Sequence, residues 1–532
     1  MNNSLGTRAF QDQGSCNKSR EFLLSLSSSQ NCLHGLLLFL LGVSLILTNR
    51  WFTEVDDECA IIDRAAQPFL HTIRLYLSGT GEHEHPPLYD LILHGWLWLT
   101  GGEQHLLRLP AIFFYIAGAW VLASAAKRRA GSASQTYTLL LIVFWPYGFH
   151  FGRLATWYSF CFLLVALATW NYFRYLESPN FSNWCWLIAS SVLLLYSNYF
   201  AWALLACLAL DFAIRNRKVP KKEWAGLVGT ALLLLAAYLP IARAFLGEIR
   251  ESVHPMGHMV TLFFTGIYNL YCVFVSESVA PWFWGLGVPV AIAIGVCLLI
   301  TFTVVPSETK RFLLYFAGLL AVMTFLGISN TKRMLFISPW LIFSVGVALK
   351  TPASKFARRA LLGALLFIAG IGWYGIISRK FYAAPHWVEP WETIAQNTAN
   401  VARAGGIIIG NNPSFFFYLT YDLVANGKES AGEFVGLLPD STRRPNVYDA
   451  SQWIEAGRPV EPHTIIVTGL PFPAPGAPMD EARRWLSSRC ILEKTVRLVH
   501  DPGAELKQRF GPDTGQRPWR IEILTYACKQ DG

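Results

Sequence analysis

The stretch that decides the fold is residues 51–90, WFTEVDDECAIIDRAAQPFLHTIRLYLSGTGEHEHPPLYD. It follows an apolar run at residues 33–48, which predicts a first membrane span. It opens with three adjacent acids at residues 56–58, and an acidic, histidine-rich cluster at residues 82–85 comes before two prolines. Ionisable groups beside a bilayer are costly to bury and often mark functional sites. We therefore expect this loop to carry a site at a membrane surface.

The composition of the whole chain indicates a polytopic membrane protein. Hydrophobic residues make up 53% of the 532 residues and charged residues only 15%, with a mean hydropathy of +0.35. This is too apolar for a water-soluble surface. The net charge of +9 is typical of basic cytoplasmic loops and argues little for nucleic-acid binding. No glycine-rich phosphate-binding motif is present, which argues against a nucleotide cofactor.

Apolar runs of membrane-spanning length recur along the first 378 residues, and they predict about eleven membrane helices. The expected spans are residues 32–49, 106–126, 135–151, 154–174, 184–199, 200–215, 224–246, 282–305, 311–328, 334–350 and 357–378. No small-residue cleavage site follows the first run, so we expect an uncleaved anchor behind a cytoplasmic tail at residues 1–31.

Positive charge sets the expected orientation. Two further apolar runs, residues 86–101 and 260–275, are treated as non-spanning, because the basic clusters then all lie on the cytoplasmic side. These clusters are residues 127–129, 215–222, 310–311 and 350–359. The acidic loop then lies outside an inner (plasma) membrane, and residues 86–101 become a helix at the membrane surface.

After residue 379 charge, proline and glycine become more frequent, which predicts an extracytoplasmic α/β domain at residues 379–532. Its expected strands are residues 406–410, 463–469 and 520–528, and its expected helices are residues 391–404 and 478–488. If this region lies outside, Cys490 and Cys528 are able to form a disulfide.

The acids of the first outer loop, Asp56, Asp57 and Glu58, are the candidate catalytic residues. A carboxylate at a membrane surface can accept a proton from an acceptor hydroxyl or amine, or help to hold a divalent cation. The alternative is a solvated acidic turn after a helix.

Histidines and a carboxylate form the candidate metal site. His83, Glu84 and His85 are contiguous, and His254 and His258 lie in a loop on the same predicted side. Imidazole and carboxylate are transition-metal ligands, but adjacent ligands do not have the spacing of a known zinc site. A divalent metal is therefore left open beside an ordinary histidine-rich turn.

Cations on the predicted outer side are candidates for holding a phosphate. Lys332 and Arg333 lie between two apolar runs against the positive-inside trend, and Arg153 with Tyr158 follows an earlier span. Arg108 opens the second span. The alternative for each is ordinary anchoring at lipid headgroups.

Taken together, these motifs resemble the bacterial relatives of the protein O-mannosyltransferases, in the GT-C superfamily that also includes the lipid A aminoarabinose transferases. The segments that carry the resemblance are Asp57-Glu58, His85-Pro86-Pro87-Leu88-Tyr89, Leu107-Arg108-Leu109-Pro110-Ala111, Gly152-Arg153-Leu154-Ala155-Thr156-Trp157-Tyr158, and Lys332-Arg333-Met334 followed by Pro339. They extend over roughly residues 33–350.

The resemblance implies an enzyme that transfers a sugar from a polyprenyl-phosphate donor to a protein, lipid or glycan acceptor at the outer membrane face. It implies Asp57 as the base or as the residue that positions the acceptor, and, because some relatives carry a metal in this region, Glu84 or His85 as candidate metal ligands. The chain departs from the pattern in its extra acid Asp56 and in the longer spacing between Arg153 and Tyr158. A lipid-linked sugar transporter or a scaffold is the alternative, but the acids lie at one membrane face rather than within the spans.

Overall fold

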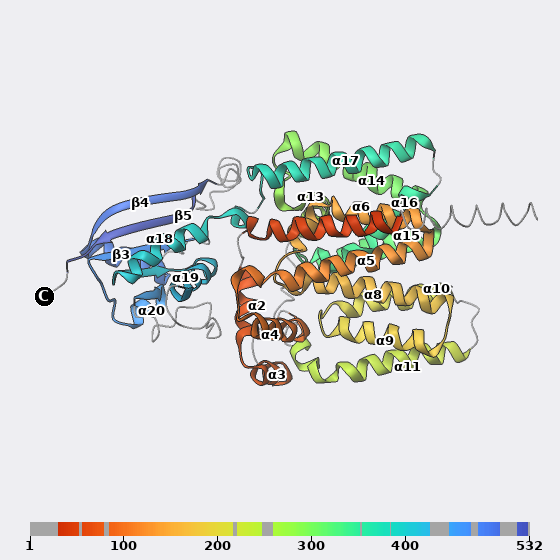
Figure 1. The fold of residues 1–532 in the computed structure, drawn as a ribbon, viewed down its shortest axis with the longest axis horizontal. Helices are drawn as coiled ribbons and strands as arrows, with labels where there is room; N and C mark the ends of the chain where they lie inside the picture. The colour runs from red at the N-terminus through yellow and green to blue at the C-terminus, as the bar shows by residue number, and fades with distance from the viewer. Residues whose placement is uncertain are drawn as a thin grey trace, which may run out of the picture.

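The computed structural model describes ten segments of the chain, and all statements below concern these residues. They are residues 30–52, 56–78, 85–215, 221–246, 259–351, 354–383, 385–425, 446–469, 477–500 and 519–529. A long bundle of helices occupies most of the molecule, and a five-stranded sheet with its own helices lies at one end of this bundle (Figure 1).

Helices form at each position where a membrane span is expected. The bundle helices are Gln30–Leu47, α5 (Leu109–Ala130), α6 (Ser132–Val143), α7 (Pro146–Phe151), α8 (Trp157–Glu177), α9 (Phe181–Leu195), α10 (Ala201–Arg215), α11 (Lys221–Tyr238), α13 (Met259–Val275), α14 (Trp284–Val304), α15 (Ser307–Phe325), α16 (Met334–Lys350) and α17 (Lys355–Ser378). Short 3-10 helices are η1 (Asn49–Trp51), η2 (Gln104–Leu106), η3 (Leu239–Ile241), η4 (Ser276–Ser278) and η5 (Pro385–Val388).

Five helices in the described segments are long and apolar enough to cross a membrane. They are Gln30–Leu47, Gln104–Ala130, Val228–Leu246, Trp284–Val304 and Lys355–Ser378. Two shorter apolar helices, Phe181–Leu195 and Met334–Lys350, fall below that length. The expected number of about eleven spans therefore stays a prediction.

Helix α16 forms the centre of the bundle. Every residue from Met334 to Leu349 is buried, as expected for a helix that is apolar on all sides. The Trp340 indole N–H donates to the Thr169 hydroxyl at 3.0 Å, which satisfies its polar atom inside the core. Helix α17 instead leaves one apolar face exposed, for example at Leu366, as a lipid-facing helix would.

Three helices of the first loop lie across the end of the bundle that faces the sheet: α2 (Asp56–Ala66), α3 (Phe69–Ser78) and α4 (Leu88–Thr100) (Figure 1). Helix α4 follows Pro86-Pro87 and is capped after Thr100 by Gly101, whose φ of 67° is the left-handed conformation that glycine adopts readily. Its 13 residues span about 20 Å, which is too short to cross a bilayer. Helix α4 is therefore not among the helices long enough to cross a membrane, and the placement of residues 86–101 at the membrane surface stays a prediction.

The predicted cytoplasmic basic clusters meet at the other end of the bundle. Helix α5 starts beside α2 and carries the chain about 33 Å along the bundle to Arg129. There Arg129 and Arg215 both pair with Glu308, and Arg311 pairs with Asp211 at 2.6 Å. The structure therefore groups three of these clusters at one end, as the charge pattern predicts.

The C-terminal region is an α/β unit. Its elements are α18 (Trp391–Arg403), β1 (Ile407–Gly410), α19 (Pro413–Ala425), β2 (Val447–Asp449), α20 (Ala450–Glu455), β3 (His463–Thr468), α21 (Pro478–Arg489), β4 (Ile491–His500) and β5 (Trp519–Ala527). The sheet order is β2-β1-β3-β5-β4, with β1 parallel to β2 and β3, and β5 antiparallel to β3 and β4. The three predicted strands are present, whereas β2 and β4 were not predicted.

The unit is attached to the bundle through the first loop. Helix α19 packs against α2, Arg50 pairs with Glu392, and Arg379 donates to the Trp51 carbonyl at 3.1 Å. The sheet region therefore lies directly over the acidic helix α2.

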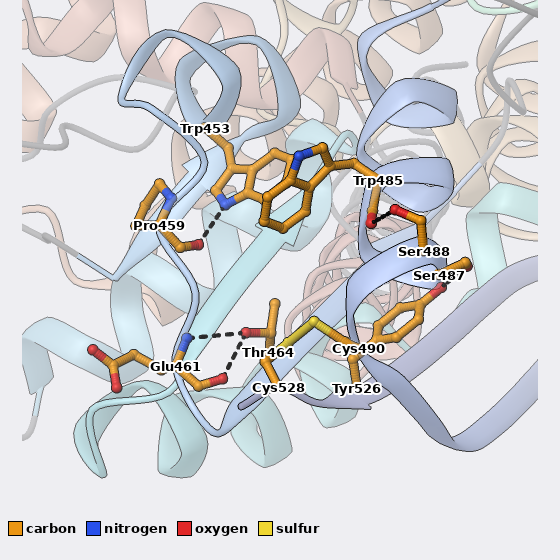
Figure 2. The surroundings of a disulfide bond; sticks show 10 residues. All are labelled: Trp453, Pro459, Glu461, Thr464, Trp485, Ser487, Ser488, Cys490, Tyr526 and Cys528. Carbon is orange, nitrogen blue, oxygen red and sulfur yellow. Dashed lines mark hydrogen bonds between the residues drawn. A yellow bond between two sulfur atoms is a disulfide. The ribbon is translucent and has the colours of Figure 1, made fainter. Parts of the chain in front are cut away.

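A disulfide joins Cys490 to Cys528, as the sequence suggested. It links the residue before β4 to the residue after β5 and so closes the far edge of the sheet (Figure 2). Trp453 and Trp485 pack edge to face at 5.4 Å in the same small core. The bridge thus fixes the ends of the two longest strands.

Candidate active site

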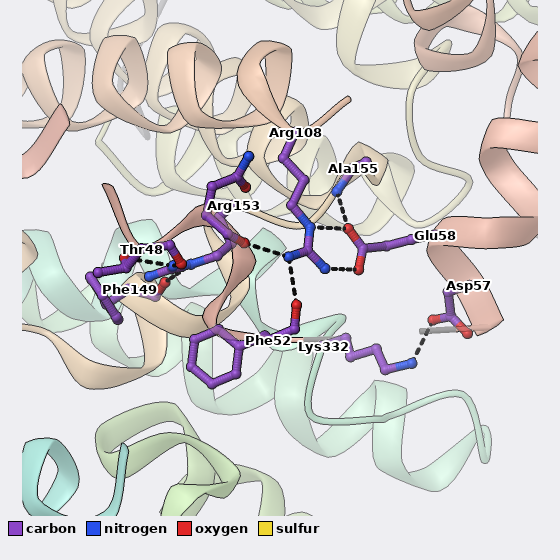
Figure 3. A network of polar contacts seen from close by, with 10 residues as sticks. Thr48, Phe52, Asp57, Glu58, Arg108, Phe149, Arg153, Ala155 and Lys332 are labelled. Atoms are coloured by element: carbon purple, nitrogen blue, oxygen red, sulfur yellow. Dashed lines mark hydrogen bonds and ion pairs between the residues drawn. The ribbon is translucent and has the colours of Figure 1, made fainter. Parts of the chain in front are cut away.

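Helix α2 presents two neighbouring carboxylates in different directions, because successive residues of an α-helix point about 100° apart. Glu58 points into the bundle, and Asp57 points toward the segment before α16 (Figure 3). The side chain of Asp56 lies outside the described part of the structure. The two described acids therefore have separate surroundings.

Glu58 forms a buried ion pair with Arg108. The guanidinium donates to both carboxylate oxygens, at 2.8 and 2.5 Å, and the Ala155 N–H donates to one of them at 2.7 Å. Arg108 also donates to the carbonyls of Asn49 and Phe52 at 2.7 and 2.9 Å. This pair ties α2, α5 and two loops together, so both side chains are engaged in holding the end of the bundle.

Arg153 is also buried, close to the end of the first helix. Its guanidinium donates to the carbonyl and hydroxyl of Thr48 and to the Phe149 carbonyl, and it lies 3.9 Å from the Phe149 ring centroid. Among the described residues its Nη2 has no hydrogen-bond partner. Its contacts hold two helix ends together, and its predicted contact with a phosphate stays a prediction.

Asp57 pairs with Lys332, a residue 275 positions later in the chain, across a 2.8 Å contact (Figure 3). The Tyr158 hydroxyl donates to the same carboxylate oxygen at 3.3 Å. The side chains of Asp57 and Lys332 remain 27% and 17% exposed, so other groups can reach them. Three of the residues selected from the sequence therefore meet at one place.

The surroundings of Asp57 keep it ionised. Burial acts to raise the pKa of this carboxyl, but the Lys332 ammonium and the Arg333 guanidinium outweigh it, so the pKa is lowered from its ordinary value. Arg333 is half-buried at the start of α16 and donates to the Ile328 carbonyl at 3.3 Å. Within the described part of the chain no carboxylate pairs with Arg333. A negative group beside Asp57 would therefore find two cations within reach.

His85 occupies a polar network rather than an open metal site. Its Nδ1 lies 2.8 Å from the Pro86 carbonyl, its Nε2 lies 3.0 Å from an Arg64 nitrogen and 3.4 Å from Asp90, and its ring stacks on Trp157. In the neutral ring, Nδ1 would donate to the Pro86 carbonyl and Nε2 would accept from Arg64, because a guanidinium only donates. A cation at this position would meet the positive charge of Arg64.

The other predicted metal ligands, His83, Glu84, His254 and His258, lie outside the described residues. Within the described segments no group of three or more His, Cys, Asp or Glu side chains is placed to hold a metal. The surroundings of His85 thus do not favour a metal, and the metal itself stays a prediction.

Sequence reasoning missed a buried acid next to this site. Glu277 in η4 accepts hydrogen bonds from the Thr331 hydroxyl and from the Trp387 indole N–H, the latter at 2.6 Å. Lys332 lies 5.3 Å from the Trp387 ring centroid. The only signal in the sequence is a lone acid between two apolar runs.

Residues 84–241 match the model of a family described as dolichyl-phosphate-mannose-protein mannosyltransferase. The fold is similar to two crystal structures of ArnT from Cupriavidus metallidurans, one in the apo state and one bound to undecaprenyl phosphate. Both align with a TM-score of 0.53 over 94% of this chain and 98% of ArnT, at 13% and 12% identity respectively. The chain has a GT-C fold.

The family match covers only part of the site, whereas the fold match extends over 94% of the chain. The matched segment of the GT-C fold includes Arg108, Arg153 and Tyr158, whereas Asp57 and Lys332 lie on either side of it. No curated protein matches the chain in sequence. The pairing of Asp57 with Lys332 therefore rests on the structure of this chain itself.

Proposed function

We propose that this chain is a membrane glycosyltransferase that takes a sugar from a polyprenyl-phosphate donor, with Asp57 as the base. The observation that carries the proposal is the accessible Asp57–Lys332 pair at the end of a GT-C helix bundle. The undecaprenyl phosphate in the ArnT structure supports a lipid phosphate as the donor's carrier.

In the proposed reaction the acceptor hydroxyl or amine attacks the anomeric carbon, and the bond from that carbon to the phosphate oxygen breaks. Asp57 takes the acceptor proton, and the lipid phosphate leaves with the bonding electron pair. Lys332 and Arg333 would stabilise the charge that grows on the leaving phosphate. Tyr158 would orient the carboxylate, and Glu58, Arg108 and Arg153 would hold the surrounding helix ends.

The resting pair also suggests how donor and base act together. With the Lys332 ammonium on it, Asp57 is a weak base because its pKa is lowered. A donor phosphate would compete for the same ammonium. Once Lys332 contacts the phosphate, Asp57 loses part of its positive surroundings and becomes a stronger base when it is needed.

We further propose that the α2 end of the bundle and the C-terminal α/β unit are extracytoplasmic. Three basic clusters gather at the opposite end, which fits the positive-inside rule. The Cys490–Cys528 disulfide fits an oxidising compartment. The α/β unit would lie over the site and would help to bind the acceptor.

The test uses the full chain reconstituted in liposomes with a panel of labelled undecaprenyl-phosphate sugars. Asp57→Asn keeps the shape of the side chain but cannot accept the proton, so transfer should fall by about 10²–10⁴-fold. The matched control is Asp480→Asn on α21, where another acid pairs with an arginine away from the site, at 3.2 Å from Arg484. Transfer at the wild-type rate by Asp57→Asn would overturn the assignment of the base.

A binding measurement tests the donor site separately. Undecaprenyl phosphate should raise the unfolding temperature of the wild-type protein, because a ligand that binds only the folded state stabilises it. Lys332→Met and Arg333→Met should each reduce this increase, and Lys310→Met at the opposite end of the bundle should not. Equal stabilisation of all four proteins would exclude Lys332 and Arg333 as phosphate ligands.

A further inference from the structure

The segment before α16 is held in place by a buried carboxylate. Glu277 is 6% exposed, and its two oxygens accept from the Thr331 hydroxyl and the Trp387 indole N–H. Within the described part of the chain no lysine or arginine pairs with it. A buried carboxylate satisfied only by neutral donors is costly to bury, so Glu277 is a candidate for a specific role.

Both donors to Glu277 are direct neighbours of Lys332. Thr331 precedes it in the chain, and the Trp387 ring lies beneath its ammonium at 5.3 Å, a cation–π distance. The Tyr147 hydroxyl fixes the same turn by donating to the Thr331 carbonyl at 2.5 Å. The direction in which Lys332 leaves the main chain is thus set by contacts that converge on Glu277.

Glu277 is itself rigidly mounted. Ser276 has a φ of 65°, a left-handed conformation that is unfavourable for a non-glycine residue. Its hydroxyl contacts His150 at 2.5 Å, and the Ser278 hydroxyl donates to the Gly372 carbonyl at 3.0 Å. The Ala383 N–H donates to the Glu277 carbonyl at 2.8 Å. The unfavourable backbone conformation of Ser276 persists because contacts with α7 and α17 fix the turn on both sides.

We propose that Glu277 is a positioning residue that, through Thr331 and Trp387, holds the Lys332 ammonium against Asp57. This positioning role rests on the proposed function only because that function makes Asp57 and Lys332 part of the active site. Trp387 belongs to the connection between α17 and the C-terminal unit, so the same contact joins that unit to the reacting groups. The Glu277 side chain accepts from these two neighbours of Lys332, and within the described residues no hydrogen bond joins it to Asp57.

The experiment measures the exposure of Lys332 directly. The full chain in detergent is acetylated with an amine-reactive ester, and mass spectrometry follows the modification rates of Lys332 and of Lys310, an internal reference at the other end of the bundle. In Glu277→Ala the Lys332 rate should rise about fivefold, the factor that one lost hydrogen bond contributes to an equilibrium. The Lys310 rate should not change.

Two further variants separate positioning from general loosening. Trp387→Phe keeps a ring below Lys332 but removes the N–H, and should give a smaller rise. Glu522→Ala removes another buried acid, which pairs with Arg497 and Arg483 in the sheet, and should leave Lys332 at the wild-type rate. If Glu277→Ala does not fold, Trp387→Phe alone carries the test. An unchanged Lys332 rate in the folded variants, or an equal rise in Glu522→Ala, overturns the proposal.

The outcome is independent of sugar transfer. If Asp57→Asn transfers normally while Glu277→Ala releases Lys332, the proposed reaction fails and the positioning role stands. If Asp57→Asn is inactive while Lys332 stays protected in Glu277→Ala, the reaction stands and the positioning role fails.

Discussion

The Glu58–Arg108 and Asp57–Lys332 ion pairs start from adjacent residues of α2 but differ in how far water reaches them. The side chains of the first pair are 0% and 1% exposed, and those of the second are 27% and 17% exposed. A fully desolvated pair is strongly destabilising to break, because the remaining charge stays buried. A partly exposed pair can exchange one partner for a ligand at little cost. The buried pair therefore holds helices together, whereas the partly exposed pair is open to a ligand.

The largest effect should come from breaking the buried pair. Arg108→Met leaves Glu58 uncompensated and should lower the free energy of unfolding by about 3–5 kcal/mol. Thermal unfolding in detergent and recovery of monodisperse protein measure this, with Lys332→Met as the comparison. If Arg108→Met were as stable as Lys332→Met, the two pairs would not differ as described.

Replacing both members of the buried pair should restore part of the loss. Glu58→Leu combined with Arg108→Met removes both charges, and such replacements are often neutral or better. The Ala155 N–H then loses its acceptor, which costs about 1–3 kcal/mol. The double variant should therefore unfold at a temperature between those of the wild type and Arg108→Met. If the double variant were less stable than Arg108→Met, Glu58 and Arg108 would not stabilise the fold as a pair.

The accessible pair should control activity through pH. In the wild type the pKa of Asp57 is lowered, so the carboxylate stays charged even when the pH falls below the ordinary pKa of an aspartate. Lys332→Met removes the main opposing charge, burial then raises this pKa, and the acid limb of the rate profile should move to higher pH. At neutral pH we expect about a 10–100-fold loss, since a hydrogen bond to a charged group contributes about 1.5–3 kcal/mol.

Initial rates across the pH range measure this shift, with Lys310→Met as a control that leaves the limb in place. The charge of Asp57 also stabilises the fold above the ordinary carboxyl pKa, and this contribution is lost as the pH falls through the lowered value. A limb that stays fixed or moves to lower pH in Lys332→Met would contradict the assignment of Asp57.

The smallest effect should come from Tyr158→Phe. Its hydrogen bond to Asp57 is 3.3 Å long, and a neutral bond of this kind contributes on the order of 0.5–1.5 kcal/mol. Rates should fall less than about tenfold. A loss of rate larger than that of Lys332→Met would mean that Tyr158 contacts the substrate directly. The hydrogen bond from Tyr158 to Asp57 would then not explain the effect.

The charge pattern was sufficient to predict that Asp57 and the cations at residues 332–333 lie on the same side of the membrane, and the structure brings Asp57 and Lys332 together. Lysine and arginine on the side predicted to be outside break the positive-inside trend, and this anomaly selected Lys332 and Arg333 as candidate phosphate ligands without any contact information. The same trend predicts that the basic ends of α5 and α10 lie on one side of the membrane. In the structure Arg129 and Arg215, from these two ends, both pair with Glu308.

The sequence could not distinguish buried cations from accessible ones. Arg108 and Arg153 have the same membrane-edge context as Arg333, but their partners are backbone carbonyls and a carboxylate brought near by tertiary packing. Glu277 was missed for a related reason: a lone acid has no periodic pattern, and its donors are 54 and 110 residues away. The short strand β2 was hidden because three residues give no alternation to detect.

The order of strands in the C-terminal unit bears on how the protein is made. Strand β5 is synthesised after β4 yet lies between β3 and β4, so β4 has no neighbour to join until β5 has emerged. The cysteine that bridges to Cys490 arrives with that same late segment. The sheet can therefore close only after β5 has been synthesised, and a nonsense mutation shortly before residue 519 would leave an open strand edge exposed to aggregation.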